Sequence, residues 1–225
     1  MQQLSGRYNQ YTSLFLKIMN KLQKNRIAGV ILAGGNANRL DGIAKGMLQV
    51  TEGVSIIERL ILELDRAEIK EVIISANDHA AYEVFGKEIV PDIRANVGPL
   101  AGIEAGLEYF ADHSDAVVFL PCDLPYITAR QVLTLKDAFI TSRAQIVFAQ
   151  TSEFFYHPLC VVVHNDLRES ISSAIDEGHR KPQDVWRQLG ASTVMFENDM
   201  PFFNINSFTD LNNWQSQIGC GKVIG

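Results

Sequence analysis

Apolar runs of strand length alternate with segments of helical periodicity through most of this 225-residue sequence, and this alternation constrains the fold more than any other feature. The runs IAGVILA, EVIISA and DAVVFLPCD are strand-like, and apolar residues spaced three and four apart lie between them. Because the runs are apolar on both faces, they predict a mostly parallel sheet covered by helices on each side, an α/β domain of three layers. Strands are expected at 27–33, 71–76, 89–92, 115–123, 146–150 and 159–163, and helices at 55–68, 78–85, 100–111, 128–141, 170–175 and 184–189.

The size of the chain favours one domain. With 225 residues and 47% hydrophobic content, it can bury one substantial core. We therefore expect a single domain over 27–225, preceded by an N-terminal extension over 1–26. The extension forms either a short amphipathic helix, with helical spacing of Phe15, Ile18, Met19 and Leu22, or an unordered leader.

Charge and cysteine content exclude several classes of protein. A formal net charge of -6 argues against a chain that coats nucleic acid, which needs a concentrated basic surface. Cys122, Cys160 and Cys220 form no C-x-x-C pair, so neither a disulfide framework nor a zinc site is predicted.

The first 26 residues lack the apolar core of a signal peptide, because Lys17 interrupts their only apolar patch. We expect no export signal, no membrane span and a cytoplasmic protein.

The loop after the first strand, LAGGNANRLDGIAKG, contains the residues of a phosphate clamp. Ligands in open α/β sheets bind at the carboxyl ends of the strands, where this loop begins. Gly34 and Gly35 let backbone N–H groups approach a phosphate closely, and Arg39 and Lys45 can neutralise part of its charge. The alternative is a tight strand-to-helix turn with both cations solvated. The loop matches neither G-x-G-x-x-G nor G-x-x-x-x-G-K-[ST], which argues against Rossmann dehydrogenases and P-loop enzymes.

A second strand ends in an acidic residue on the same edge. In FLPCDLPYIT, Asp123 follows an apolar run that ends in Pro121 and Cys122. Mg²⁺ is usually held by one or two carboxylates together with substrate phosphates and water, so Asp123 is a candidate ligand for Mg²⁺. The alternative is an aspartate that only shapes the turn before Pro125.

Taken together, LAGGNANR with Lys45, GPLAGI from Gly98, PCDLPYI from Pro121 and NINSF from Asn204 resemble the motifs of the molybdenum cofactor guanylyltransferase family, within the LAGG-type nucleotidyltransferase superfamily. The resemblance covers residues 27 to about 214. It implies a Rossmann-like nucleotidyltransferase fold, with a nucleotide half over about 27–125 and an acceptor half over about 126–225. It also implies transfer of GMP from GTP to molybdenum-molybdopterin, with release of pyrophosphate and with Mg²⁺ as cofactor.

The resemblance assigns roles to residues position by position. Arg39, Lys45 and Asp123 would be catalytic, with Asp123 also binding the metal. The nucleotide would be bound by Leu32, Ala33, Gly34, Gly35, Lys45, Ser75, Asn77, Asp92, Gly98 and Asp123. Two departures affect the nucleotide side: Leu40, Asp41 and Gly42 stand where the family usually has Met-Gly-Gly, and Ser75 stands where it often has Asn. Asp41 would weaken triphosphate binding unless it turns away or is paired.

The expected acceptor-binding residues are Tyr156, His157, Arg180, Lys181, Asn204 and Asn206. Each has a structural alternative: His157 could orient a loop, Arg180 and Lys181 could form an exposed basic turn, and the asparagines could cap the helix that follows. Ser207 and Thr209 compete for that cap.

Three rival functions remain open at this point. The chain could be a related transferase that uses CTP or acts on a sugar phosphate or another small phosphorylated acceptor. It could instead be a nucleotide-binding protein without turnover, although the presence of Arg39, Lys45 and Asp123 argues against that. The extension could in addition make transient contacts with proteins that deliver or receive the cofactor.

Overall fold

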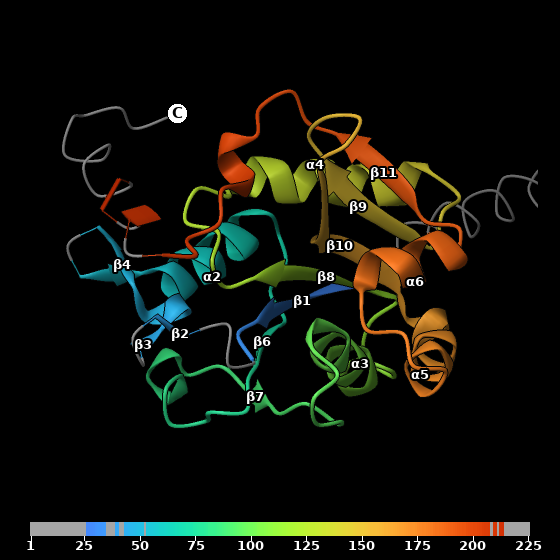
Figure 1. The fold of residues 1–225 in the computed structure, drawn as a ribbon, viewed down its shortest axis with the longest axis horizontal. Helices are drawn as coiled ribbons and strands as arrows, with labels where there is room; N and C mark the ends of the chain where they lie inside the picture. The colour runs from blue at the N-terminus through green and yellow to red at the C-terminus, as the bar shows by residue number, and fades with distance from the viewer. Residues whose placement is uncertain are drawn as a thin grey trace, which may run out of the picture.

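A seven-stranded sheet forms the centre of the computed structural model, which describes residues 26–34, 39–40, 43–51, 53–207, 209–210 and 212–213 (Figure 1). Its strand order is β11-β9-β10-β8-β1-β6-β7. The strands are β1 (Ile27–Leu32), β6 (Val72–Ser75), β7 (Ile89–Val90), β8 (Ala116–Pro121), β9 (Ile146–Gln150), β10 (Tyr156–His164) and β11 (Ser192–Met195). Among the described strands of this sheet, only β10 runs antiparallel to its neighbours, β8 and β9. The predicted mostly parallel α/β architecture is confirmed.

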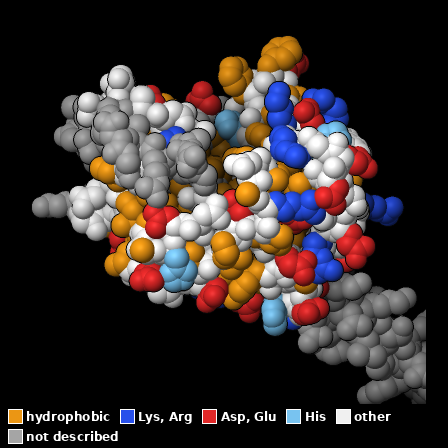
Figure 2. Space-filling view, turned by 60° about the horizontal axis from the view of Figure 1, so that its bottom comes forward, with side chains coloured by type: hydrophobic (Ala, Val, Ile, Leu, Met, Phe, Trp, Pro, Cys, Tyr) orange, Lys and Arg blue, Asp and Glu red, His pale blue; other side chains and the backbone are white. Residues whose placement is uncertain are grey.

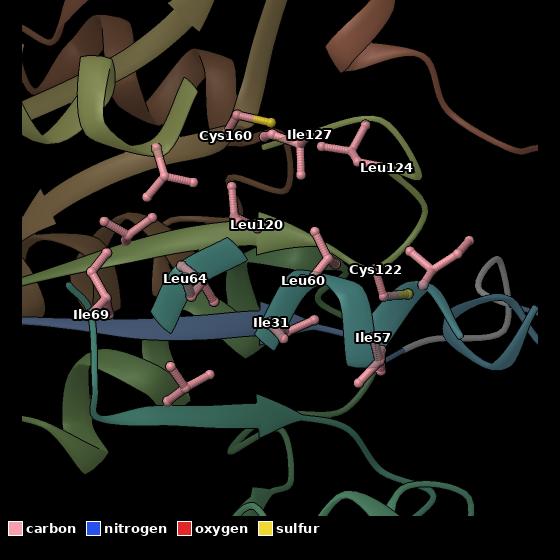
Figure 3. Packing of buried hydrophobic residues seen from close by; sticks show 14 of the residues in the cluster. Ile31, Ile57, Leu60, Leu64, Ile69, Leu120, Cys122, Leu124, Ile127 and Cys160 are labelled. Carbon is pink, nitrogen blue, oxygen red and sulfur yellow. The ribbon is translucent and has the colours of Figure 1, made fainter. Parts of the chain in front are cut away.

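Helices cover both faces of the sheet, as Figure 1 shows. They are α2 (Ile56–Arg66), α3 (Pro99–Tyr109), α4 (Ala129–Thr141), α5 (Arg168–Asp176) and α6 (Pro182–Gln188). One core cluster joins α2 and α4 to the sheet, and the other joins α3, α5 and α6 to the opposite face. Successive side chains of β1 point to opposite faces of the sheet, so Ile31 belongs to the first cluster and Val30 to the second. In Figure 3, Leu60 and Leu64 of α2 pack over Ile31 and Leu120.

The helix starts follow from local sequence. Ser55 caps α2 by accepting a hydrogen bond from the Glu58 N–H at 3.2 Å. Thr128 and Gln131 form a capping box at the start of α4, and the buried Glu63 accepts from the Ala129 N–H at 2.7 Å. These caps fix where each helix leaves the sheet edge.

One sequence prediction needs correction, and one strand of the sheet was missed. The helix predicted at 78–85 is wrong, because only Glu83–Phe85 forms a 3-10 turn. Tyr82 is the one buried residue of 78–85, so the segment has no continuous apolar face for a longer helix. The strand β11 was not predicted, because three of its four residues are exposed and it lacks a buried apolar run.

Short elements connect β1 to α2. They are β2 (Arg39–Leu40), β3 (Ile43–Ala44), the 3-10 helix η2 (Lys45–Met47), β4 (Gln49–Thr51) and β5 (Val54–Ser55), and none of them was predicted. No helix within the described residues combines the length and the hydropathy needed to cross a bilayer.

Candidate active site

Three strands end in register at one edge of the sheet. Leu32 at the end of β1 pairs with Ser75 of β6 on one side and with Pro121 of β8 on the other. The contacts continue beyond the strands, since the Ala33 N–H donates to the Ser75 carbonyl at 2.8 Å and the Cys122 N–H to the Leu32 carbonyl at 3.0 Å. The segments LAG, SAN and PCD therefore leave the sheet side by side, as the sequence predicts.

Lys45 and Asp123 form the charged centre of this edge. The η2 turn brings the Lys45 ammonium to 3.6 Å from Asp123 Oδ2, and the two side chains are 6% and 12% exposed. Gly46, the next residue of η2, packs so tightly that a Cβ there would lie 2.6 Å from the Ile57 side chain. The lysine is thus held against the sheet edge by close packing of η2 on α2.

The C-terminal NIN segment closes on the same pair. The Ile205 N–H donates to the Asp123 carbonyl at 3.0 Å, and Lys45 Nζ donates to Asn206 Oδ1 at 2.9 Å. Asn206 is therefore a partner of the expected phosphate-binding lysine, a contact that the sequence did not predict. Asn204 is exposed.

A capping arrangement explains why the Asn206 side chain is available to Lys45. Ser207 and Asp210 take the cap positions: Ser207 Oγ accepts from the Asp210 N–H at 3.1 Å, and Asp210 Oδ2 accepts from the Ser207 N–H at 2.8 Å. Asp210 Oδ2 also accepts from the Asn206 N–H at 3.0 Å. The competition for the cap that the sequence left open is thus settled in favour of Ser207.

The Asp123 carboxylate has the features of a metal ligand. Its Oδ1 is buried and has no hydrogen-bond partner among the described residues. Burial raises the pKa of the carboxyl group, and the nearby Lys45 opposes that rise. Within the described residues no group of three or more His, Cys, Asp and Glu side chains could hold a metal. One carboxylate with substrate phosphates and water is nevertheless a usual set of ligands for Mg²⁺, so Asp123 fits that ion.

Asn77 and Asp92 form the other side of the edge. Asn77 Nδ2 donates to Asp92 Oδ2 at 2.9 Å, and the Asp92 N–H donates to Asn77 Oδ1 at 3.0 Å. A Cβ on Gly34 would lie 3.6 Å from the Asp92 carboxylate, so the glycine loop starts beside this pair. The structure brings these three expected nucleotide-binding residues together.

Ser75 and the start of α3 complete this side. Ser75 Oγ is buried without a hydrogen-bond partner among the described residues, and a Cβ on Gly102 would lie only 2.7 Å from it. Gly98, with φ of 77°, turns the chain into α3 at Pro99. Gly102 was not among the predicted site residues, although it lies within the GPLAGI motif.

Tyr156 and His157 reach the same edge from the antiparallel strand β10. His157 Nε2 lies 3.1 Å from Thr151 Oγ1, and its ring stacks on Phe202 with centroids 4.6 Å apart. Desolvation lowers the pKa of His157, and the charge of Asp199 opposes the change. These contacts support the loop-orienting alternative for His157.

The basic turn that carries Arg180 and Lys181 is anchored to the C-terminal end of α5. Arg180 Nη1 donates to the carbonyls of Ile175 at 2.9 Å and His179 at 2.8 Å, so its guanidinium satisfies carbonyl groups at the C-terminal end of α5. Lys181 is exposed and precedes α6. In Figure 2 the surface is hollowed, and Lys and Arg side chains gather beside the hollow.

Some predictions lie outside the described part of the chain. They concern the extension at 1–25, Gly35, the Arg39 side chain, Asp41, Gly42 and Cys220. Cys122 and Cys160 are buried free thiols, and burial raises the pKa of Cys122 to about 12.

Comparison with known proteins identifies the family. Residues 29–194 match the model of the MobA-like NTP transferase domain. A molybdenum cofactor guanylyltransferase of Bordetella pertussis is 34% identical over 87% of this chain and 100% of its own length. One from Serratia proteamaculans is 33% identical over 86% of this chain and 96% of its own length.

Solved structures share the fold at lower identity. The molybdopterin-guanine dinucleotide biosynthesis protein A of Archaeoglobus fulgidus superposes with a TM-score of 0.69 at 20% identity, covering 86% of this chain and 99% of that one. A 4-diphosphocytidyl-2C-methyl-D-erythritol synthase from Anaerococcus prevotii also gives 0.69, at 13% identity, covering 89% and 99%. The fold is therefore shared at sequence identities of 13% and 20%. With the family model spanning most of the chain and relatives matched over nearly their full length, the chain belongs to the MobA-like NTP transferase family.

Proposed function

We propose that this chain transfers GMP from GTP to molybdopterin that carries molybdenum, which forms the guanine dinucleotide cofactor and releases pyrophosphate. The observation that carries the proposal is the enclosed Lys45–Asp123 pair at three aligned strand ends. The curated relatives that match the chain over most of its length are named molybdenum cofactor guanylyltransferases, which supports this choice of substrates.

The reaction joins two phosphates. An oxygen of the acceptor's phosphate attacks the α-phosphorus of GTP, the bond from that phosphorus to the bridging oxygen breaks, and pyrophosphate leaves with the electron pair. The attacking phosphate is already an anion, so the chain needs no general base and no covalent intermediate. Positioning and charge neutralisation then supply most of the rate enhancement.

The residues at the strand ends divide this work. The Lys45 ammonium would neutralise negative charge on the triphosphate, with Asn206 fixing its position at 2.9 Å. The backbone at Ala33 and Gly34 would approach the nucleotide closely, and Asn77 and Asp92 would bound its site. Arg39 would add a second cation to the loop.

Mg²⁺ belongs to the proposal as a cofactor. Asp123 would hold it through the buried Oδ1, which has no hydrogen-bond partner among the described residues. When bound, the ion would neutralise charge on the phosphates and stabilise the departing pyrophosphate. We also place the reaction in the cytoplasm, where free thiols such as Cys122 and Cys160 stay reduced.

The test is pyrophosphate release by purified protein supplied with Mg²⁺, molybdenum-molybdopterin and GTP, CTP, ATP or UTP in separate reactions. We expect release with GTP that depends on the acceptor and is lost in Asp123→Asn. A preference for CTP would overturn the nucleotide assignment, and no release with any nucleotide would overturn the activity.

A further inference from the structure

Arg94 makes an extensive set of polar contacts outside the charged centre. It lies between β7 and α3, and its side chain is 28% exposed. Nε donates to Glu104 Oε1 of α3 at 3.0 Å, and Nη2 donates to Ser172 Oγ of α5 at 2.7 Å. Nη1 forms an ion pair with Asp176, the last residue of α5. One guanidinium therefore joins its own segment to two helices.

The segment that holds Arg94 belongs to the nucleotide side of the site. Asp92, two residues earlier, forms the double hydrogen bond with Asn77 and lies beside Gly34. Gly98, four residues later, turns the chain into α3. A shift of residues 91–98 would therefore move the nucleotide-binding edge.

The contacts of Arg94 with α5 lead to the acceptor side. Asp176 is followed by the turn that carries Arg180 and Lys181, the basic residues assigned to the acceptor. Arg180 is anchored to the carbonyls of Ile175 and His179, so this turn moves with the end of α5.

The chemistry of the link requires an arginine. The Glu104 carboxylate is 6% exposed and needs a cation within reach, whereas Asp176 is 67% exposed. A planar guanidinium can contact both carboxylates and the Ser172 hydroxyl in one geometry, which a lysine ammonium cannot reproduce. The hydrogen bond to Asp176 raises the pKa of Arg94 and lowers that of Asp176, so both remain charged near neutral pH.

We propose that Arg94 is a positioning residue that fixes the nucleotide-binding segment 91–98 relative to the acceptor-binding turn after α5. The inference rests on the proposed function, since it assigns one substrate to each side. Arg94 touches neither substrate in this account. It holds the two binding surfaces at the separation that in-line transfer requires, where small displacements cost much of the rate.

The chain offers a matched control. Arg168 Nε pairs with Glu108 Oε2 at 3.1 Å, which links the first residue of α5 to the last turn of α3, whereas Arg94 contacts the end of α5 and the middle of α3. Arg168 is 33% exposed, close to the value for Arg94. Arg168→Gln removes a similar link between α3 and α5 without touching segment 91–98.

The experiment compares Arg94→Gln, Arg94→Lys, Asp176→Asn, the double variant Arg94→Gln/Asp176→Asn and Arg168→Gln in steady-state transfer. We expect Arg94→Gln to lower kcat by about tenfold while KM for GTP and for the acceptor stay within about twofold, and Arg168→Gln to stay within about twofold of the parent protein in all three values. Arg94→Lys should recover only part of the loss, and Asp176→Asn should add little to Arg94→Gln, because the two residues act through one contact.

The outcomes separate the two claims. If the parent protein is active and Arg94→Gln matches Arg168→Gln in kcat, or changes only the KM values, the positioning role is wrong. Additive effects in the double variant would also overturn it. If the parent protein shows no transfer, the proposed function itself fails.

Discussion

The ammonium of Lys45 lies 3.6 Å from the carboxylate of Asp123, and packing encloses both side chains at the point where β1, β6 and β8 end. A charge pair removed from water in this way is not a general source of stability, because desolvation offsets much of the attraction. The pair lies at the edge of an α/β sheet where ligands bind, so we attribute its burial to function and not to stability. The predictions below separate the roles of the residues around this pair.

Replacing Lys45 should remove most of the activity. Lys45→Met retains the length of the side chain and deletes the charge, so we expect kcat/KM for GTP to fall by about 10²- to 10³-fold. Lys136→Met is the control, because Lys136 is another largely enclosed lysine, whose Nζ donates to the Ala67 carbonyl at 2.8 Å away from the strand ends. Equal kinetics of the two variants would contradict the role of Lys45.

The two asparagines of the NIN segment should differ in their effect on GTP. Asn206 fixes the Lys45 ammonium at 2.9 Å, so Asn206→Ala should raise KM for GTP by roughly tenfold, as expected for a hydrogen bond to a charged group. Both asparagines are exposed, but the bond to Lys45 is made by Asn206, so Asn204→Ala should leave KM for GTP within about twofold. Steady-state kinetics at saturating acceptor measure both. A similar rise in the two variants would show that Asn206 does not act through Lys45.

Two glycines one turn apart in α3 should separate stability from function. A Cβ on Gly102 would lie 2.7 Å from Ser75 Oγ at the site, whereas one on Gly106 would lie 2.8 Å from Val30 and 2.9 Å from Phe119 in the core. Both Gly→Ala variants should lose about 1–3 kcal/mol of stability through overpacking. Only Gly102→Ala should also raise KM for GTP severalfold. Denaturant unfolding and kinetics on the same preparations check this, and unchanged GTP affinity in Gly102→Ala would refute it.

His157 should contribute to acid destabilisation. Desolvation holds its pKa in the folded state below the ordinary value of 6.5. Between that lowered pKa and 6.5 the unfolded chain binds more protons than the folded one, so stability falls as the pH drops through this window. His157→Phe keeps an aromatic ring against Phe202 and removes the titration, so its Tm should fall less than that of the parent protein between about pH 7.5 and pH 5.

The control for this prediction is His113→Gln, which changes an exposed histidine at the turn after α3. That variant should follow the parent protein across the whole pH range. If His157→Phe loses Tm on acidification as steeply as the parent protein, the histidine does not carry the effect.

The fold was largely predictable because apolar runs and helical spacing specify which segments are strands and helices. The strands β1, β6 and β8 are buried on both faces, and their sequences indicate this directly. The segment 78–85 was misjudged because its apolar residues suggested a helical face, while the structure buries only Tyr82 among them. The exposed edge strand β11 has no apolar run that would mark it.

The positions of Lys45 and Asp123 could be predicted, whereas their contacts could not. Asp123 was expected at the carboxyl edge because it follows the end of β8, and Lys45 because it lies in the loop that leaves β1. The hydrogen bond from Lys45 to Asn206 joins residues 161 positions apart, and local sequence contains no information on such a pairing. The four-residue link through Arg94 was missed for the same reason, since it depends on how α5 packs against α3.

The central claim is best tested by a competition that identifies the product. The protein is given Mg²⁺, molybdenum-molybdopterin and equal concentrations of GTP, CTP, ATP and UTP, and the dinucleotide formed is identified by its mass. We expect the guanine dinucleotide as the main product, and no dinucleotide with Asp123→Asn. A main product containing another base, or an undiminished yield with Asp123→Asn, would contradict it.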